Sequence, residues 1–161
     1  YADIYDFSLL ADPGGDLTSS ASGTVLYGIT YGDGIYGNGT IFSVNSDGTH
    51  YKDLVDFNGL NGQFPMKSSL ILSGGKLLGV STEGGAHSDG AVFSLDTSGA
   101  NFKDIFSFNG TNGQNPMGKL VMSGTAVYGI TNQGGANIAG VIFSVDTAGN
   151  DYHDLYDFNS A

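Results

Sequence analysis

The chain has 161 residues, a net charge of −11, five Lys and Arg against 16 Asp and Glu, and no Cys. A surface that binds nucleic acid needs clustered basic side chains, so nucleic acid is excluded as a main partner. The absence of cysteine removes disulfides, Cys-ligated zinc and thiol catalysis. No apolar run approaches the roughly 20 residues of a membrane helix, so we expect no membrane insertion and a single domain over residues 1–161.

The chain opens with a short segment that recurs three more times. Residues 1–7 read Tyr-Ala-Asp-Ile-Tyr-Asp-Phe, and related runs begin at residues 51, 102 and 152, which are 50, 51 and 50 residues apart. Self-similarity at a fixed period indicates a repeat architecture. We therefore predict a copy of the last strand at residues 1–7, followed by repeat units at about 8–58, 59–109 and 110–161.

Two further signatures follow in the same order within every unit. An apolar run interrupted by Gly and ending in Ser or Thr lies at residues 26–30, 77–81 and 127–131. A run with Phe-Ser at its centre lies at residues 40–45, 91–96 and 141–146. These runs are rich in Val, Ile, Phe and Tyr and are bounded by Gly, Asn, Asp and Ser, which predicts strands. No apolar period is long enough for a helix.

Each unit predicts four antiparallel strands. In the last copy these lie at residues 119–122, 126–131, 141–146 and 152–158. In the first copy the first strand, around residues 17–20, has lost most of its apolar residues. Four strands in about 50 residues are typical of a β-propeller blade. The predicted fold class is all-β, with tandem four-stranded antiparallel repeats that resemble blades, three units plus an extra terminal strand.

The repeats also carry two predictions about side chains in the core. A Gly inside the second strand of each unit, at positions 28, 79 and 129, predicts a bulge or a close backbone approach near a central axis. The Phe residues at repeat positions are predicted to form the core between blades. They are Phe7, Phe42, Phe57, Phe93, Phe108, Phe143 and Phe158.

Copies two and three carry motifs of a known family. Phe108-Asn-Gly-Thr-Asn-Gly-Gln-Asn-Pro116 and Val127-Tyr-Gly-Ile-Thr-Asn-Gln-Gly-Gly135 resemble the GloVer tandem repeats of large bacterial surface or secreted proteins. Copy one departs from the pattern, since residues 8–16 replace the Asn-Gly loop. The resemblance implies propeller-like blades and an extracellular or cell-surface location, and it names no ligand.

Three units and a stub do not close a propeller, which usually needs at least about four blades. The segment could belong to a longer ring, several chains could close one ring, or chains could add strands to one another in a filament. Our main hypothesis is a non-catalytic extracellular structural module that self-assembles head to tail through its terminal β-strands. On this hypothesis, deleting residues 1–7 should weaken association.

The alternative function is a propeller lectin or adhesin. The framework repeats while the loop after the second strand varies, and variable loops on a rigid scaffold are common recognition sites. Tyrosine rings there would stack on a sugar, and polar side chains would bond its hydroxyls. The candidate ligand-binding residues are Tyr31, Asp33, Tyr36, Glu83, His87, Asp89, Asn132 and Asn137. The competing explanation is that the loop sequence varies by drift and has no function.

An aspartate recurs at Asp3, Asp53, Asp104 and Asp154. A ladder of calcium sites is one interpretation, and local hydrogen bonding at the start of the last strand is the one we favour, because no nearby loop supplies several oxygens. We therefore predict no metal site and no cofactor. No nucleophile elbow, Walker-type loop or zinc-protease motif occurs, so we predict no catalytic residue and no enzyme activity.

Overall fold

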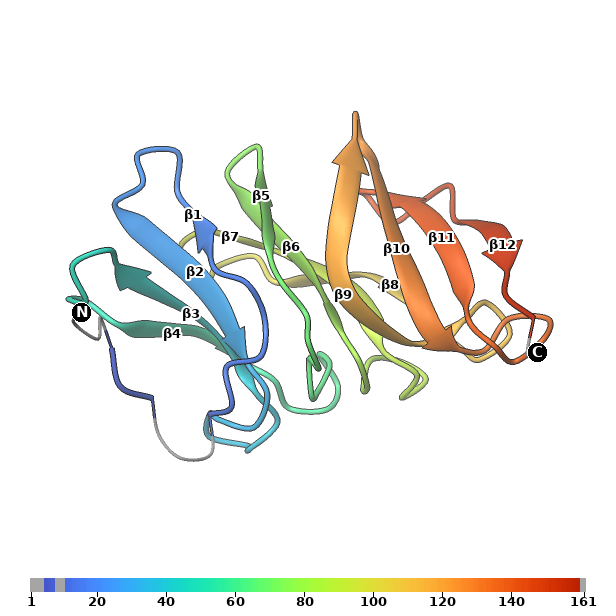
Figure 1. The fold of residues 1–161 in the computed structure, drawn as a ribbon, viewed down its shortest axis with the longest axis horizontal. Helices are drawn as coiled ribbons and strands as arrows, with labels where there is room; N and C mark the ends of the chain where they lie inside the picture. The colour runs from blue at the N-terminus through green and yellow to red at the C-terminus, as the bar shows by residue number, and fades with distance from the viewer. Residues whose placement is uncertain (1–4, 8–10, 160–161) are drawn as a thin grey trace.

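The computed structural model describes residues 5–7 and 11–159, which form three four-stranded antiparallel sheets (Figure 1). Sheet 1 holds β1 (Thr18–Ser19), β2 (Val25–Thr30), β3 (Thr40–Asn45) and β4 (Lys52–Asp56). Sheet 2 holds β5 (Ile71–Ser73), β6 (Lys76–Ser81), β7 (Ala91–Asp96) and β8 (Lys103–Ser107). Sheet 3 holds β9 (Gln114–Ser123), β10 (Ala126–Gln133), β11 (Val141–Asp146) and β12 (His153–Asp157). The predicted all-β, blade-like fold is confirmed.

The strand boundaries differ from the prediction at both ends of the chain. β9 begins at Gln114 rather than at residue 119, because β10 continues to Gln133 and pairs with Gln114. β1 has two residues, in keeping with its weak apolar pattern. Of the strand predicted at residues 1–7, residues 5–7 form no strand, and residues 1–4 lie outside the described part of the chain.

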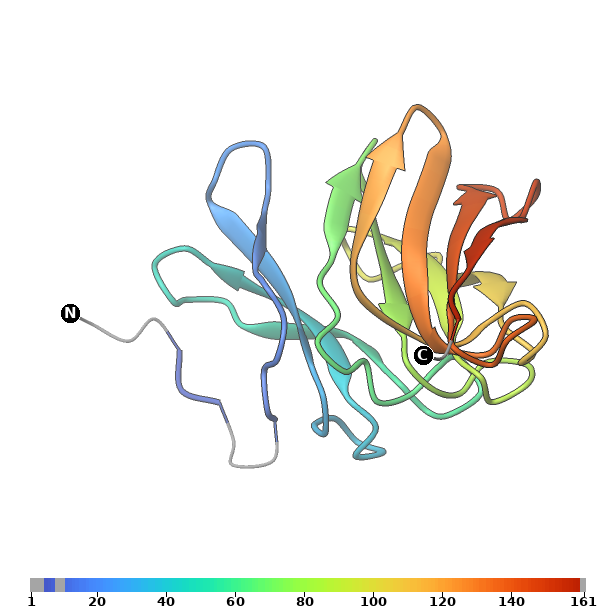
Figure 2. The same ribbon diagram turned by 45° about the vertical axis from the view of Figure 1, so that its right-hand side comes forward.

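The three sheets stand side by side like the blades of an open fan (Figures 1 and 2). Between sheets, β1 lies against β5, and β9 lies against both β5 and β6. The backbone N–H of Asp16, before β1, donates to the Ser69 hydroxyl, before β5, at 2.9 Å. Ser69 in turn forms a parallel bridge with Lys119 of β9. The first strand of each sheet therefore lies on the inner side of the fan.

Two apolar cores lie between the sheets. Successive residues of a strand point to opposite faces, so Leu77 of β6 packs toward sheet 1 while Leu78 packs toward sheet 3. The core between sheets 1 and 2 contains Tyr27, Ile29, Ile41, Phe57, Leu70, Leu77, Phe93 and Leu95. The core between sheets 2 and 3 contains Leu78, Val80, Val92, Ile105, Phe108, Leu120, Val127, Val141, Phe143 and Val145. Sheet 2 is thus buried on both faces.

A phenylalanine ring lies across the glycine of the second strand in every sheet. Gly79 is the cross-strand partner of Phe93, and a Cβ on Gly79 would lie 2.7 Å from Phe93 Cζ. The same distance is 2.4 Å for Gly28 and Phe42 and 2.5 Å for Gly129 and Phe143. The predicted close approach is therefore made by a neighbouring side chain rather than near an axis.

A bulge was the other predicted reason for the glycine, and the pairing of the second strand with the third shows none in sheets 1 and 2. The register of β2 with β3 and of β6 with β7 runs unbroken through Gly28 and Gly79. In sheet 3 a register shift between β9 and β10 does lie beside Gly129, between Tyr128 and Ile130. A missing side chain is enough to admit the ring, so the strand needs no extra residue.

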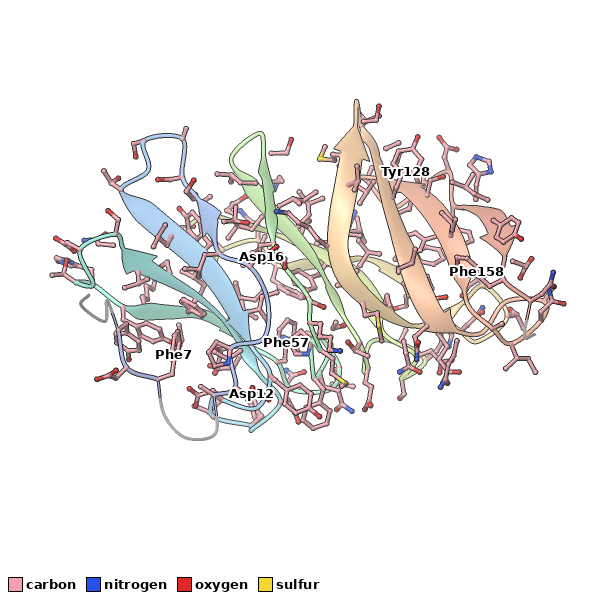
Figure 3. All side chains as sticks on the ribbon, viewed as in Figure 1. Phe7, Asp12, Asp16, Phe57, Tyr128 and Phe158 are labelled. Carbon is pink, nitrogen blue, oxygen red and sulfur yellow. The ribbon has the colours of Figure 1, made fainter. Side chains whose placement is uncertain are left out.

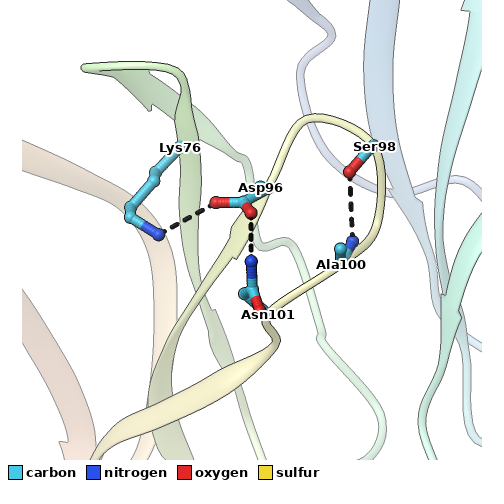
Figure 4. Close-up of polar contacts among 5 residues, drawn as sticks. All are labelled: Lys76, Asp96, Ser98, Ala100 and Asn101. Carbon is cyan, nitrogen blue, oxygen red and sulfur yellow. Dashed lines mark hydrogen bonds and ion pairs between the residues drawn. The ribbon is translucent and has the colours of Figure 1, made fainter.

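In sheets 2 and 3, the aspartate that ends the third strand holds the turn that follows it. In sheet 2, Lys76 Nζ lies 2.9 Å from Asp96 Oδ1, and the Asn101 amide donates to Asp96 Oδ2 at 2.6 Å (Figure 4). These two hydrogen bonds, that from Lys76 first, lower the pKa of Asp96 below its usual value. In sheet 3, the backbone N–H groups of Ala148 and Asn150 donate to Asp146 Oδ1.

We expect Gly79→Ala to lower the free energy of unfolding by about 2 kcal/mol, because the new methyl group would overlap the Phe93 ring. Urea denaturation measures the change. Gly14→Ala is the matched control, since the nearest atoms would lie at 3.8 Å, and it should stay within about 0.5 kcal/mol. Adding Phe93→Leu should recover part of the loss. Equal costs for Gly79→Ala and Gly14→Ala would contradict the ring-over-glycine constraint.

Candidate functional site

The predicted recognition loops connect the second and third strands and lie at one end of the sheets (Figure 1). The loops of sheets 1 and 2 are each bonded to the connection that leads into the following sheet. The Phe64 N–H donates to the Asn38 carbonyl at 2.8 Å, and the Asn115 N–H donates to the Asp89 carbonyl at 2.9 Å. The loops and connections therefore form one continuous rim.

Several predicted ligand residues are engaged within the rim. Glu83 accepts a hydrogen bond from Gln63 Nε2 at 3.0 Å, and the Asn137 amide donates to Asn159 Oδ1 at 2.7 Å. The Tyr31 ring lies 5.2 Å from the Phe64 ring. Of the remaining predicted residues, Asp33 and Asp89 are half-buried, whereas Tyr36, His87 and Asn132 are exposed. The rim spreads the eight residues along all three sheets and does not gather them in one cleft.

Tyr31 lines a hollow of about 390 Å³ together with Asp12, Gly14, Met66 and Lys67. None of the other predicted ligand residues lines this hollow. It lies where the chain before β1 meets the connection between sheets 1 and 2. Sequence analysis missed Asp12 and Lys67, because neither occupies the variable loop.

The backbone around the hollow is strained. Asp12, Phe64 and Lys67 have backbone φ values of 40°, 46° and 51°, which residues other than glycine seldom adopt. The corresponding positions in the next connection hold Asn115 and Gly118, residue types that adopt this conformation more readily. Strain of this kind often marks a functional site, so the hollow is a candidate binding site.

The recurring aspartates make local hydrogen bonds. The Ser107 hydroxyl donates to Asp104 Oδ2 at 2.6 Å. Burial raises the pKa of Asp154, and the nearby Asp157 charge raises it further. Asp3 lies outside the described residues. Within residues 5–7 and 11–159, no group of three or more His, Asp or Glu side chains is arranged to hold a metal ion.

A second position in the last strand, which sequence analysis did not single out, holds the loops in place. Asp56, Ser107 and Asp157 end the last strand of their sheets, β4, β8 and β12 respectively, immediately before the recurring Phe. Their side-chain oxygens accept the backbone N–H of Ile35 at 3.2 Å, of Ala86 at 3.1 Å and of Ala136 at 2.6 Å. The recurrence of Asp or Ser before that Phe is the signal that would have found them.

The outer face of sheet 3 exposes apolar side chains at positions that are buried in sheet 2. In sheet 2, the residues that face sheet 3 are at most 6% exposed; they are Leu78, Val80, Val92, Ile105 and Phe108. Their counterparts 50 residues later are Tyr128, Ile130, Ile142, Leu155 and Phe158. Among these, Ile130 is 48%, Leu155 50% and Phe158 36% exposed. The face of a buried interface is therefore left open.

Phe158 corrects one sequence prediction. Phe42, Phe57, Phe93, Phe108 and Phe143 are buried as predicted. Phe158 instead lies at the far end of the fan, beyond sheet 3, whereas Phe57 lies between sheets 1 and 2 (Figure 3). A core residue between blades is buried only where a neighbouring sheet covers it, and within residues 5–7 and 11–159 no sheet lies against this side of sheet 3.

Each of the two outer faces has features that suit the other. On sheet 3, Val121, Tyr128, Ile130 and Ile142 line a hollow of about 240 Å³. On sheet 1, Leu17 is 54% exposed. A Cβ on Gly28 would meet Leu17, as one on Gly79 would meet Leu70 and one on Gly129 would meet Leu120. Leu17 is therefore the counterpart of two residues that are buried inside the molecule.

Lysines connect consecutive sheets at the rim opposite the loops. Lys52 Nζ donates to the Ser98 carbonyl at 3.3 Å, and Lys103 Nζ donates to the Ala148 carbonyl at 2.9 Å. Each lysine thus joins the last strand of one sheet to the third turn of the next. At the two ends of the fan these positions hold His153 in β12 and Asp47 in the third turn of sheet 1.

A family profile described as the Gloeobacter/Verrucomicrobia repeat matches residues 3–161. No curated protein sequence matches the chain. Within the described residues, no helix is long and apolar enough to cross a membrane.

Solved structures share the fold. A chain of the nidogen/laminin complex superimposes with a TM-score of 0.64 at 18% identity, over 94% of this chain and 49% of that one. TolB from Acinetobacter baumannii gives 0.62 at 15% identity, over 94% and 34%. The tricorn protease gives 0.54 at 20% identity, over 92% and 13%. The chain thus spans about half, a third and an eighth of these chains.

We expect Asp157→Ala to lower the free energy of unfolding by about 1 kcal/mol, because the Ala136 N–H loses its acceptor. Asp157→Ser is the matched variant, since serine makes this bond in sheet 2. It should keep the hydrogen bond and remove a like charge beside Asp154, and so should be at least as stable as the parent near neutral pH. Thermal unfolding compares the three proteins. If Asp157→Ser were as unstable as Asp157→Ala, residue 157 would not hold the loop in this way.

Proposed function

The chain belongs to the Gloeobacter/Verrucomicrobia repeat family, and we propose that it is a non-catalytic propeller-blade module that associates head to tail with further copies of itself. The observation that carries this proposal is the open outer face of sheet 3. That face repeats the residues by which sheet 2 packs on sheet 3. An exposed apolar surface of this kind is typical of an interaction site.

A second copy is the partner that this face fits, because the chain carries the complementary surface at its other end. The outer side of sheet 1 holds the exposed Leu17 and, beneath Phe7, the buried Phe42; these are the counterparts of Leu120 and Phe143, with which sheet 3 meets sheet 2. In a contact built on the internal pattern, His153 of one copy would face Asp47 of the next. The His153 ring would then donate a hydrogen bond to the turn that contains Asp47, as Lys52 and Lys103 donate to carbonyls of the third turn in the next sheet.

Such a contact is heterologous, since two different faces meet. Copies joined in this way form a ring if the rotation between them closes and a filament if it does not. The proposed location is extracellular or at the cell surface, which rests on the resemblance of the repeats to those of bacterial surface and secreted proteins. The non-catalytic role is supported by Asp56, Ser107 and Asp157, whose polar side chains serve to hold loops.

We expect Phe158→Asp to weaken self-association by about 30-fold or more, because a buried interface anchor contributes about 2 kcal/mol. Sedimentation velocity over a range of protein concentrations measures the association constant. Ile138→Asp is the control, since Ile138 is a 78% exposed loop residue of the same sheet. Added salt should strengthen association, because copies with a charge of −11 repel one another. A parent chain that stays monomeric at high concentration would contradict the proposal.

Glycan binding at the loop end is the second candidate function, and the strained hollow beside Tyr31 is the observation that favours it. The hollow offers an aromatic ring, the Asp12 carboxylate and the Lys67 ammonium group within one surface. An aromatic face with adjacent polar groups is suited to a sugar ring. The rim itself stays accessible in a head-to-tail assembly, so the two functions are compatible.

If the hollow binds sugars, Tyr31→Ala should weaken binding about tenfold, the equivalent of about 1.4 kcal/mol. A glycan array identifies the ligand and calorimetry measures its affinity. Tyr31→Phe keeps the ring and should retain most of the affinity. Tyr36→Ala, in the same loop but outside the hollow, should leave binding unchanged. The absence of any bound glycan, or equal losses for Tyr31→Ala and Tyr36→Ala, would exclude this hollow as a sugar site.

A further inference from the structure

The same aromatic contact closes each interface between sheets. The Phe that follows the last strand of one sheet meets the central Phe of the next sheet edge to face. The ring centroids of Phe57 and Phe93 lie 5.5 Å apart at 61°, and those of Phe108 and Phe143 lie 5.0 Å apart at 70°. Phe7 repeats this contact on the open face of sheet 1, where its ring lies 5.1 Å from Phe42 at 65°.

A second ring contact also holds residues 5–7 against sheet 1. Tyr5 stacks on Tyr51 with centroids 4.2 Å apart and an angle of 5°. Between sheets 2 and 3, Phe106 stacks on Tyr152 at 4.2 Å and 2°. Residues 5–7 therefore lie on sheet 1 as the last strand of a preceding sheet would, although they form no strand themselves.

The two ends of the chain carry the same side chains. Residues 5–7 and 156–158 both read Tyr-Asp-Phe, whereas the internal copies read Val-Asp-Phe at 55–57 and Phe-Ser-Phe at 106–108. One Tyr-Asp-Phe segment occupies the face of sheet 1. The other stands at the open end of sheet 3, where Tyr156 is 54% exposed.

We propose that the outer face of sheet 1 is the receptor for the Tyr-Asp-Phe segment of a second copy, and that residues 5–7 of the same chain occupy it as an internal competitor. This inference rests on the proposed head-to-tail association. Both segments require Phe42 and Tyr51 as partners, so they cannot bind one face together. Association then requires that residues 5–7 leave the face.

The second copy brings more contact surface than the internal segment. Tyr5 remains 40% exposed on sheet 1, and Phe7 is half-buried. Residues 156–158 arrive with the rest of sheet 3, including the exposed side chains of Val121, Ile130 and Leu155. Displacement is therefore favourable at high protein concentration, and residues 5–7 keep dilute chains apart.

This packing reverses the effect expected from sequence for loss of the first residues. We expect deletion of residues 1–7 to strengthen self-association about tenfold or more, the factor gained when a state that is about 10% competent becomes fully competent. Sedimentation velocity at fixed salt compares the deleted and full-length chains. Phe7→Asp in the full-length chain should act in the same direction and tests the inference if the deleted chain does not fold.

Two controls separate specific exchange from aggregation of an uncovered face. Phe158→Asp added to the deleted chain should return it to the monomer. A peptide with the sequence of residues 3–7, Asp-Ile-Tyr-Asp-Phe, should inhibit association of the deleted chain, whereas a peptide of the same composition in scrambled order should not.

The outcomes distinguish this inference from the proposed function. If the deletion and Phe7→Asp leave the association constant unchanged while Phe158→Asp lowers it, the competitor role is wrong and head-to-tail association stands. Weaker association after deletion would show that residues 1–7 donate the contact, and would also overturn the competitor role. If the full-length and deleted chains are both monomeric at every concentration, the proposed association itself is wrong.

Discussion

The fold depends on one steric relation, the phenylalanine ring that crosses a strand at a glycine. Phe93 pairs with Gly79 across β6 and β7, and no side chain larger than hydrogen leaves room for its ring. The ring then meets Phe57 from the preceding sheet. A contact within one sheet and a contact between sheets therefore share the same residue, and each sheet is positioned by its neighbour.

A stack built in this way has two unlike ends. Sheet 2 buries both faces, whereas sheets 1 and 3 each bury one against a neighbouring sheet. In repeat proteins, stability comes from the units and from the interfaces between neighbours, so an end without a neighbour lacks one interface. In this structure the outer face of sheet 3 is open, whereas Phe7 lies against Phe42 on the outer face of sheet 1.

The loops between the second and third strands are held by contacts other than the core packing. The loops are held by the side chain before the recurring Phe, as Asp157 holds Ala136, so the framework supports them whatever their sequence. That support leaves side chains such as His87 and Asn132 free to vary without loss of the fold. The hollow beside Tyr31 is the exception, because Asp12, Met66 and Lys67, which line it, lie outside the variable loop.

The repeat length, the strand order and most of the core could be predicted from the amino-acid sequence. Apolar alternation and turn residues are local signals, and repetition in three copies placed β2, β3 and β4 with little ambiguity. The same repetition led to the wrong prediction that Phe158 is buried. Residues at the same repeat position have the same surroundings only where an adjacent sheet packs against both. Glu83 and Asn137 were predicted to face a ligand, yet their bonds to Gln63 and Asn159 join residues about 20 positions apart. Only the tertiary structure decided these contacts and the return of Tyr5 and Phe7 onto sheet 1, since they arise from packing between segments distant in sequence.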